Sequence, residues 1–400
     1  MHRIDAPGNL SGHFTEGDPQ NAIAPTTVSG AWLEDVQESI VQVIESEGIA
    51  LVKGNGAQLL DALHRIARGQ AALRNVLING DFSIIQRETV GASLATGVAA
   101  YVLDRWRIDQ NNSSGNVDVQ QLRYSGSGGG SSFPTGSHRN KMILTLYGTN
   151  LANPVLVQQR VEDVRTLGAA KATLSCWIRR FPVGSPGATT VTVTPRLRQY
   201  HGGGASDVLL TGTALVLPTT VWQHVSWTFD VPEPGAIGTS SMSYLEASLR
   251  ISGWDASPAG VELVDVQLER GGSASLFEEL PLELTYLLAA RYYEKSLRIP
   301  VGLTYFASNL PDYGGASRGQ ESGTIARCLC TRFRVPKVKV PTVTWYSPET
   351  AVAAKVRWNS ADVTVSSTNH TTEEQTGEPV VGSSQSDTGV YAHWTADAEL

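Results

Sequence analysis

The residue types in this sequence best suited to binding chemistry are aromatic side chains that stand next to short polar groups. A flat ring can stack on the face of a sugar ring, while the neighbouring polar groups hydrogen-bond its hydroxyls. We predict a sugar-binding role for such residues where they lie exposed on loops, with packing in a core as the alternative for each ring. The candidates are Tyr200 and His201 before three glycines, Trp254 beside Asp255, Tyr313, and also Tyr305, Trp345, Tyr346 and Trp358.

Two carboxylates are candidates for a structural calcium site. Asp81 and Asp265 fall on the first and last predicted strands of one β-structure, where carboxylate and carbonyl oxygens can share a calcium ion. Calcium takes roughly six to eight oxygen ligands, and the sequence suggests only these two carboxylates. The alternative is that Asp81 caps a turn, so we expect no cofactor, with structural calcium left open.

The tripeptide Asp104-Arg105-Trp106 places a guanidinium beside an indole, a pair that could also stack on a sugar. We favour a structural role. Trp106 is expected in a core, and Arg105 is expected to pair with Asp104, or with Glu162 or Asp163. Internal ion pairs of this kind fix the register of neighbouring strands and bind no ligand.

Motifs of nucleophilic or metal-dependent catalysis are not evident. We find no GxSxG nucleophile elbow, no HExxH and no glycine-rich loop that opens a helix, the patterns that position a nucleophile, a zinc ion or a phosphate. A glycosidase-type carboxylate pair is matched in space and leaves no sequence pattern; Glu246, Asp255 and Glu262 are eligible. The sequence therefore predicts a protein that is not an enzyme.

Composition narrows the class of partner. The 400 residues exceed one ordinary domain, and 41% hydrophobic residues, 17% charged residues and 39 glycines indicate a β-rich globular chain of several units. A net charge of −7 argues against binding to nucleic acid or to an anionic membrane, because both attract basic faces. We expect no membrane insertion, since no apolar run approaches the roughly 20 residues that span a bilayer.

The three cysteines and the first thirty residues bear on where the chain is made. The cysteines form no disulfide framework, and the first thirty residues lack the basic-then-apolar pattern of a signal peptide, so we expect no Sec export and synthesis in a reducing cytosol. Cys328 and Cys330 share one face of a predicted strand. Buried thiols are expected there, with a metal shared across a threefold axis as the alternative.

The N-terminal part predicts an arm and two helices. Residues 1–30 are rich in proline and glycine and predict an extended attachment arm. Residues 31–72 predict a helical segment with Ser29 as N-cap and with Trp32, Val36 and Ile40 on one stripe. Two helices of this size bury too little apolar surface alone, so we expect a sister chain or a docking protein to cover them.

From residue 73 the hydrophobic period changes to two, and about eight alternating segments predict an antiparallel two-sheet sandwich of jelly-roll type over 73–280. A register change at Gln120-Gln121 predicts a β-bulge. Pro281 predicts the first turn of a linker helix within 281–298. The predicted strands are 141–147, 156–161, 173–178, 190–199, 222–229, 244–251 and 261–269.

Residues 299–400 predict a β-rich C-terminal domain, with strands over 325–333, 343–346, 363–366 and 390–395. Large aliphatic residues are scarce in this segment, so it is expected to make a poor core as a monomer. Packing around a threefold axis would supply the missing burial, and we therefore predict a homotrimer.

Separate short motifs occur along nearly the whole chain. They are His2 to Asp5, Phe14 to Pro19, Trp32 to Glu38 and Ile44 to Ile49; Asn79 to Phe82, Gln86-Arg87, Asp104 to Trp106, Val157 to Arg165 and Leu268 to Gly271; and Arg291 to Ser296 and Ala392 to Leu400. Together they resemble bacteriophage or prophage tail fibre and receptor-binding proteins that carry a jelly-roll domain similar to a carbohydrate-binding module.

The resemblance implies a homotrimeric structural protein of the virion tail, made in the cytoplasm of a bacterial host. Its N-terminus would attach to tail or baseplate proteins, with Phe14, Trp32, Val36 and Ile40 as docking residues. Its β domains would bind a host-surface glycan or an outer-membrane receptor, through loops or the C-terminal domain. The alternatives are a tailspike enzyme that depolymerises polysaccharide and a purely architectural baseplate component.

Overall fold

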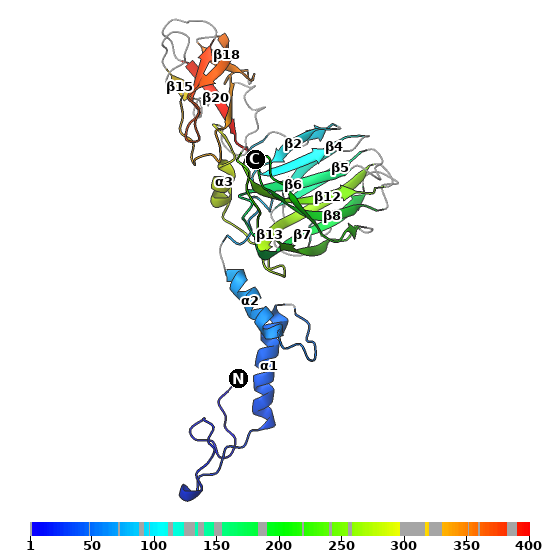
Figure 1. Ribbon diagram of the computed structural model, residues 1–400, viewed down its shortest axis with the longest axis vertical. Coiled ribbons are helices and arrows are strands. Elements are labelled where there is room, and N and C mark those ends of the chain that lie inside the picture. Colours follow the sequence, from blue (N-terminus) through cyan, green and yellow to red (C-terminus); the bar gives the residue numbers. More distant parts are fainter. Residues whose placement is uncertain are drawn as a thin grey trace. The chain divides into compact units, whose positions relative to one another are not determined.

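The structure, a computed structural model, describes residues 2–400 except 48, 71–72, 88–91, 96, 111–114, 124–132, 135–139, 148–153, 183–189, 218–219, 240–241, 255–257, 297–316, 320–329, 351, 359–360 and 382–389. The chain divides into two compact units, Met1–Leu73 and Arg74–Leu400. Figure 1 colours the chain along its sequence. The predicted fold class is confirmed, since two helices precede a mainly β, antiparallel sandwich that a β-rich segment follows.

The first unit consists of the arm, a short 3-10 helix η1 (Pro19–Asn21), α1 (Gly30–Ser46) and α2 (Gln58–Gln70). Ser29 is the N-cap of α1, as predicted, because its hydroxyl accepts the Trp32 N–H at 3.3 Å. The arm is held by turns and by α1. The Trp32 indole donates to the His2 carbonyl at 3.1 Å, and its ring meets the Phe14 ring edge-on at 5.1 Å.

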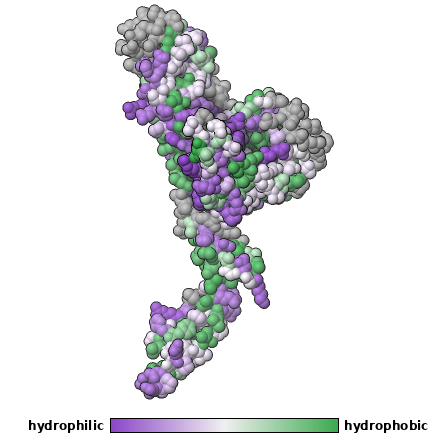
Figure 2. Space-filling model, in the orientation of Figure 1, coloured by the Kyte–Doolittle hydropathy of each residue, from purple (hydrophilic) through white to green (hydrophobic). Residues whose placement is uncertain are grey.

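Large apolar side chains of this unit face outward, as Figure 2 shows along the helices. Leu33 is 54% exposed and Ile40 41% on α1, while Leu60 is 54% and Leu63 50% on α2. Exposed apolar area of this extent on two short helices is typical of a surface that another protein chain covers.

The second unit begins with a sandwich of two antiparallel sheets (Figure 1). The six-stranded sheet has the order β1 (Ala92–Leu94), β4 (Val117–Arg123), β5 (Asn140–Leu146), β13 (Ala259–Arg270), β7 (Ala170–Pro182) and β11 (Gln223–Val231). The seven-stranded sheet has the order β10 (Leu215–Val216), β8 (Thr192–Tyr200), β12 (Tyr244–Ser252), β6 (Val155–Glu162), β3 (Trp106–Gln110) and β2 (Ala99–Leu103), with β9 (Val208–Thr211) also paired to β8.

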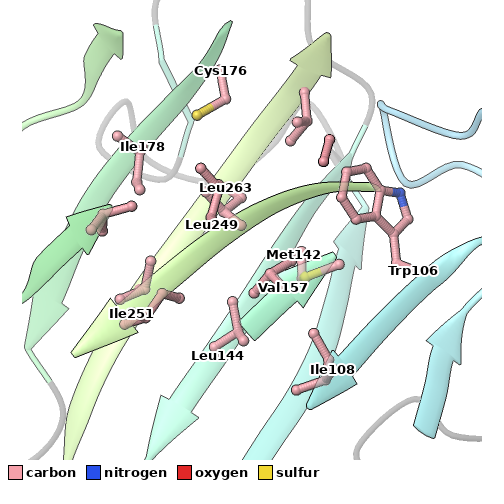
Figure 3. Close-up of a cluster of buried hydrophobic side chains, with 14 of the residues drawn as sticks. Trp106, Ile108, Met142, Leu144, Val157, Cys176, Ile178, Leu249, Ile251 and Leu263 are labelled. Atoms are coloured by element: carbon pink, nitrogen blue, oxygen red, sulfur yellow. The ribbon is translucent and has the colours of Figure 1, made fainter. Parts of the chain in front are cut away.

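The inward side chains of the two sheets form one core. Alternate residues of each strand point to the same face, so Leu144 of β5 and Leu263 of β13 meet Val157 of β6 and Leu249 of β12 between the sheets, as Figure 3 shows. Trp106 lies in this core at 2% exposure, as predicted.

The predicted bulge at Gln120-Gln121 is wrong. Strand β4 pairs with β5 without a register shift from Val117 to Arg123. The apolar pattern breaks because Gln121 takes a core-side position, where its amide donates to the Phe82 carbonyl at 3.1 Å. A bulge does occur in β13, between Val264 and Gln267.

The turn Asn79-Gly80-Asp81-Phe82 fastens the start of the unit to the sandwich. Asn79 has a positive φ of 60°, and its side chain bonds both the N–H and the C=O of Ile84. The Asn79 carbonyl accepts the Trp106 indole N–H at 2.8 Å. Gly80 approaches β13 so closely that a Cβ would lie 2.2 Å from the Val266 oxygen, so only glycine fits here.

The C-terminal segment follows α3 (Leu282–Ala290), for which Pro281 is the N-cap. Its sheet contains β14 (Tyr293–Lys295), β20 (Val390–Asp397), β17 (Lys355–Trp358), β18 (Ala361–Asn369) and β19 (Glu378–Val381), with β15 (Ser317–Gly319) and β16 (Thr342–Tyr346) also paired to β20.

This segment has its own core, which corrects the expectation that it lacks core formers. Trp345, Trp358 and Trp394 supply the burial that its few aliphatic residues cannot. Of the predicted strand 325–333, residues 325–329 lie outside the described residues, and Arg332 forms only an isolated bridge with Gln375.

Buried ion pairs join the end of the chain to the sandwich. Arg105, 1% exposed, donates to Glu399 and to the Arg160 carbonyl, and its guanidinium lies 3.3 Å from the centre of the Tyr292 ring. Arg87 pairs with Glu399 at 3.1 Å. The partners predicted for Arg105 are therefore wrong, because Arg105 pairs instead with Glu399, about 300 residues further along the chain.

Each predicted partner of Arg105 is engaged elsewhere. Glu162 pairs with Arg291 at 2.6 Å, and Asp163 pairs with Arg165 at 3.2 Å. Asp104 accepts the backbone N–H of Gln86 at 2.5 Å and its side-chain N–H at 2.9 Å. Burial raises the pKa of the Asp104 carboxyl to about 6, although Arg87 and the Gln86 donors oppose the shift.

We predict that Glu399→Ala lowers the free energy of unfolding by about 3–5 kcal/mol, because Arg105 then stays buried without its carboxylate. Urea unfolding followed by tryptophan fluorescence measures the change. Arg165→Ala, which breaks an exposed pair, is the control and should change stability by less than about 1 kcal/mol. Similar small losses in both variants would contradict the role of Glu399.

Asp104 predicts a second stability effect, which depends on pH. The folded chain holds this proton more tightly than the unfolded chain, so Asp104 stabilises the fold below about pH 3.8, and the contribution is lost as pH rises through about 6. Asp104→Asn removes this titration and should flatten the fall in unfolding free energy over that window by up to about 3 kcal/mol.

Chemical unfolding of both proteins at a series of pH values measures this effect. Glu162 and Asp362, whose pKa values are lowered by their hydrogen-bond partners against the opposing effect of burial, titrate alike in the two chains and cancel in the comparison. Parallel stability profiles for Asp104→Asn and the unsubstituted chain would refute the assignment.

Candidate functional site

The candidate site is the outer face of the seven-stranded sheet, which we name the polar face. Val193 and Leu197 of β8, Leu245 and Leu249 of β12 and Val157 of β6 point into the core, so the residues between them point outward. The polar face consists of Thr192, Thr194, Arg196, Arg198 and Tyr200 of β8; Tyr244, Glu246, Ser248, Arg250 and Ser252 of β12; Leu156, Gln158, Arg160 and Glu162 of β6; and Arg107 and Asp109 of β3.

Two tyrosines form the aromatic part of the polar face. Tyr200 and Tyr244 are cross-strand partners, and their rings stack with centroids 4.5 Å apart and planes 23° apart. The Arg160 guanidinium lies 4.6 Å from the centre of the Tyr244 ring, and that of Arg198 lies 5.3 Å from the Tyr200 ring. Cations above both rings hold the pair in place.

Charged residues form the next row of the polar face. Glu246 lies between Arg198 and Arg160 in the strand register, and Arg160 Nε donates to its carboxylate at 3.0 Å. Arg198 Nε donates to Asp207 at 2.9 Å. These pairs are partly screened from water, so the side chains are held in fixed positions.

A pocket of about 460 Å³ opens at the tyrosine end of the polar face, and its volume suits a small organic ligand. Tyr101 and Arg160 both donate to a backbone oxygen of Leu400 there. Rings, cations and hydrogen-bond acceptors thus surround one opening. Its lining residues are Arg160, Tyr200, Met242, Tyr244, Lys339 and Leu400.

A second pocket, of about 540 Å³, contains His201 among glycine-rich turns. His201 is 2% exposed, and its Nε2 accepts the Gly235 N–H at 3.3 Å. Tyr200 and His201 are neighbours in sequence but line separate pockets. The structure therefore does not bring these two predicted residues into one site.

Several predicted sugar-binding rings are buried. Trp254 is fully buried in the sandwich core, so the expectation of an exposed ring is wrong there; the chain turns at Gly253, with φ 73°, and carries the indole inward. Trp345 and Trp358, each 1% exposed, lie in the C-terminal core. Asp255, Tyr305 and Tyr313 lie outside the described residues.

The two predicted calcium ligands lie near each other. The Val266 N–H donates to the Gly80 carbonyl at 3.0 Å, which brings the neighbouring Asp81 and Asp265 together. Asp81 caps its turn by accepting the Ser83 hydroxyl at 2.8 Å and the Ser83 N–H at 3.3 Å. In the described part of the chain, no three acidic, histidine or cysteine side chains gather as a metal site; structural calcium at this position stays a prediction, since calcium also takes carbonyl oxygens.

Of the eligible catalytic carboxylates, the two that the structure describes, Glu246 and Glu262, do not form a pair. Glu246 belongs to the polar face, whereas Glu262 points outward from the other sheet, since Val261 and Leu263 beside it lie in the core. Glu262 pairs with Lys141 at 2.6 Å and also with Arg179. The third candidate, Asp255, lies outside the described residues.

One pentapeptide, residues 315–319, does carry the letters GxSxG, which corrects the expectation that the pattern is missing. Its Ser317 begins strand β15, which pairs with β20. A nucleophile elbow requires a turn from a strand into a helix, and Ser317–Gly319 form a strand instead.

Of the cysteines, Cys330 is partly buried, while Cys328 lies outside the described residues.

The residues predicted to dock the N-terminus lie in the first unit. Phe14 and Trp32 are in contact, Val36 is partly buried, and Ile40 is exposed.

Among the described helices, none is long and apolar enough to cross a bilayer.

Sequence reasoning missed the arginines and the second tyrosine of the polar face. Arg160, Arg198 and Tyr244 stand at alternating positions of strands that the sequence did predict. Strand alternation could have identified them as outward residues, but only the register shows that they meet.

No family model and no curated protein matches the chain. Among solved structures, the carbohydrate-binding module TmCBM61 in complex with β-1,4-galactotriose is 14% identical, with 50% of this chain and 99% of that chain covered and a TM-score of 0.29. The enzymatically active domain of tailspike protein 4 of bacteriophage CBA120 is 14% identical over 50% of this chain and 22% of that chain, with a TM-score of 0.31.

The CBM22-1 xylan-binding domain of Paenibacillus barcinonensis Xyn10C is 10% identical, over 47% of this chain and 99% of that chain, with a TM-score of 0.27. Similarities this weak assign no ligand to the present chain.

Proposed function

We propose that this chain is an attachment protein of the phage tail-fibre kind, which binds a host-surface glycan through the polar face. The observation that carries the proposal is the stacked pair Tyr200 and Tyr244 beside fixed arginine and carboxylate groups, at the mouth of a pocket of about 460 Å³. Aromatic faces bind the apolar side of a sugar ring, and convergent polar groups bind its hydroxyls.

The rings and the charged groups of the polar face have different roles in the proposed binding. Tyr200 is partly exposed and offers the exposed part of its ring to the sugar, while Tyr244 stacks against it. The Arg160 and Glu246 pair offers donors and an acceptor in fixed positions, so the ligand orders few side chains when it binds. A single site of this size binds weakly, and several copies in one fibre would raise the avidity.

We also propose that the first unit attaches the fibre to tail or baseplate proteins and supports a homotrimer, with the virion tail as its location after synthesis in the host cytoplasm. The exposed apolar residues of α1 and α2, among them Leu33 and Ile40, favour this assignment. Phe14, Trp32, Val36 and Ile40 are its proposed docking residues. Burying such a surface between chains gains roughly 25 cal/mol for each Å² removed from water.

We further propose that binding occurs without hydrolysis of the glycan. Glu246 and Glu262 lie on opposite outer faces and both form ion pairs, whereas a glycosidase needs two carboxyl groups roughly 5–10 Å apart across the scissile bond. A purely architectural baseplate role would need no ring pair beside a pocket on the polar face.

Tyr200→Ala is predicted to weaken glycan binding by roughly five- to tenfold, because it removes the partly exposed ring of the stack. Binding is measured on an array of host-surface polysaccharides and by titration of the best ligand. Trp177→Ala removes a ring from the outer face of the other sheet and serves as the matched control. A loss confined to Trp177→Ala would transfer the site to that sheet, and new reducing ends during incubation would favour the enzyme.

Light scattering is predicted to give three times the chain mass of 42.8 kDa. Ile40→Lys combined with Leu60→Lys should shift the protein toward monomer, because charges then occupy the apolar surface of the helices. Val216→Lys, at a 49% exposed site of the sandwich, is the control and should leave the mass unchanged. A monomer in the unsubstituted chain would refute the trimer.

A further inference from the structure

The polar face is more basic than the chain that carries it. It has five arginines, Arg107, Arg160, Arg196, Arg198 and Arg250, and three carboxylates, Asp109, Glu162 and Glu246, whereas the whole chain has a net charge of −7. One of these carboxylates is also engaged elsewhere, since Glu162 pairs with Arg291. A surface rich in arginine on a chain of net negative charge can attract an anionic ligand.

Three of these arginines have a carboxylate partner. Arg107 pairs with Asp109 at 3.4 Å, Arg160 pairs with Glu246 at 3.0 Å, and Arg198 pairs with Asp207 from the loop before β9. Arg196 differs. Within the described residues it forms no ion pair, and its Nε is buried without a hydrogen-bond partner.

The surroundings of Arg196 add a second unfavourable interaction to its unpartnered donor. A like-charged neighbour, Arg250, lies on the adjacent strand β12 two residues beyond Ser248, where Arg250 faces Thr194 and Arg196 faces Ser248. Burial and the Arg250 charge both lower the pKa of Arg196. Buried donors in folded proteins almost always have an acceptor, so an anion brought by a ligand would satisfy Arg196 and relieve its repulsion from Arg250.

The groups around Arg196 are suited to a carbohydrate. Cross-strand pairing sets Arg196, Ser248, Gln158 and Arg107 in one row over four strands. Ser248 and Gln158 are buried, at 6% and 2% exposure, so the partly exposed groups at the two ends of the row are the guanidinium groups. Tyr200 stands four residues along β8 on the same face, roughly 13 Å away at the rise of an extended strand. A ligand that spans both points is an oligosaccharide.

We propose that the polar face selects acidic oligosaccharides, with a sugar carboxylate bound by Arg196 and a sugar ring stacked on Tyr200. This inference rests on the proposed glycan-binding function and adds the class of glycan. A carboxylate is the preferred anion because its two oxygens match the planar fork of a guanidinium. A phosphate- or sulfate-bearing glycan would present the same charge with tetrahedral geometry, which the test separates.

The experiment uses the full chain and acidic oligosaccharides in matched pairs. Oligogalacturonate, alginate oligomers and oligosialic acid are titrated calorimetrically, each beside its carboxyl methyl ester, with a sulfated oligosaccharide and a neutral galactan for comparison. At least one acid is expected to bind roughly tenfold more tightly than its ester, because the hydrogen bonds to a charged partner are lost on esterification. Added salt is expected to weaken binding of the acid and to leave binding of the ester unchanged.

Arg196→Gln should lower the affinity for the acid to that for the ester and leave the affinity for the ester unchanged. Arg196→Lys, which keeps the charge and loses the fork, should fall between them. Arg270→Gln removes an exposed arginine from the other sheet and is the control for net charge, with no change expected. A folded Arg196→Gln protein is verified by its unchanged ester binding.

The outcomes separate this inference from the proposed function. Glycan binding that needs Tyr200 but is insensitive to esterification and to Arg196→Gln overturns the acidic specificity and leaves the glycan-binding function standing. Tightest binding to the sulfated oligosaccharide overturns the carboxylate assignment. Failure of every acidic and neutral oligosaccharide to bind overturns both proposals.

Discussion

The buried contact between Arg105 and Glu399 is the constraint on which the second unit depends. A guanidinium at 1% exposure is unfavourable unless charge and hydrogen-bonding groups surround it, and its partners come from three parts of the chain. Glu399 supplies the counter-charge, the Arg160 carbonyl accepts a further N–H, and the Tyr292 ring covers one face. The end of the chain, α3 and the sandwich must all be in place for this contact to form.

The same contact reaches the polar face through Arg160. The backbone of Arg160 accepts from Arg105, while its side chain donates to Glu246 and to a backbone oxygen of Leu400. Residues 399 and 400 thus hold the base of the pocket beside Tyr244. The candidate site is consequently not a property of the sandwich alone, because its cationic group is positioned by a segment about 240 residues later in the chain.

Local patterns in the sequence predicted the strands, the N-cap at Ser29 and the core position of Trp106, because each depends on neighbouring residues only. Long-range pairing escaped the prediction. The carboxylate that Arg105 meets is distant in sequence, whereas the sequence favoured the nearer Asp104, Glu162 and Asp163 as partners. The bulge near Gln121 failed for a related reason, since a glutamine that bonds the Phe82 carbonyl breaks the apolar pattern without breaking the strand.

The sequence predicted which residue types the candidate site would contain, but not which of the candidate rings would lie on the surface. An aromatic ring beside polar groups did identify Tyr200, yet it equally identified Trp254, which completes the core. Loop sequences carry no information on burial, whereas a two-residue period shows which side chains leave the sheet.

The polar face also departs from what stability alone would select. Partly buried arginines are desolvated, and replacing ion pairs of this kind by packed apolar residues is often neutral or stabilising. Arg196 lies next to Arg250, its pKa is lowered by burial and by that charge, and its Nε has no hydrogen-bond partner within the described residues. Functional sites commonly retain such destabilising arrangements because the ligand supplies the missing interaction. The unpartnered Nε of Arg196 therefore supports the proposed anion site more directly than the number of arginines does.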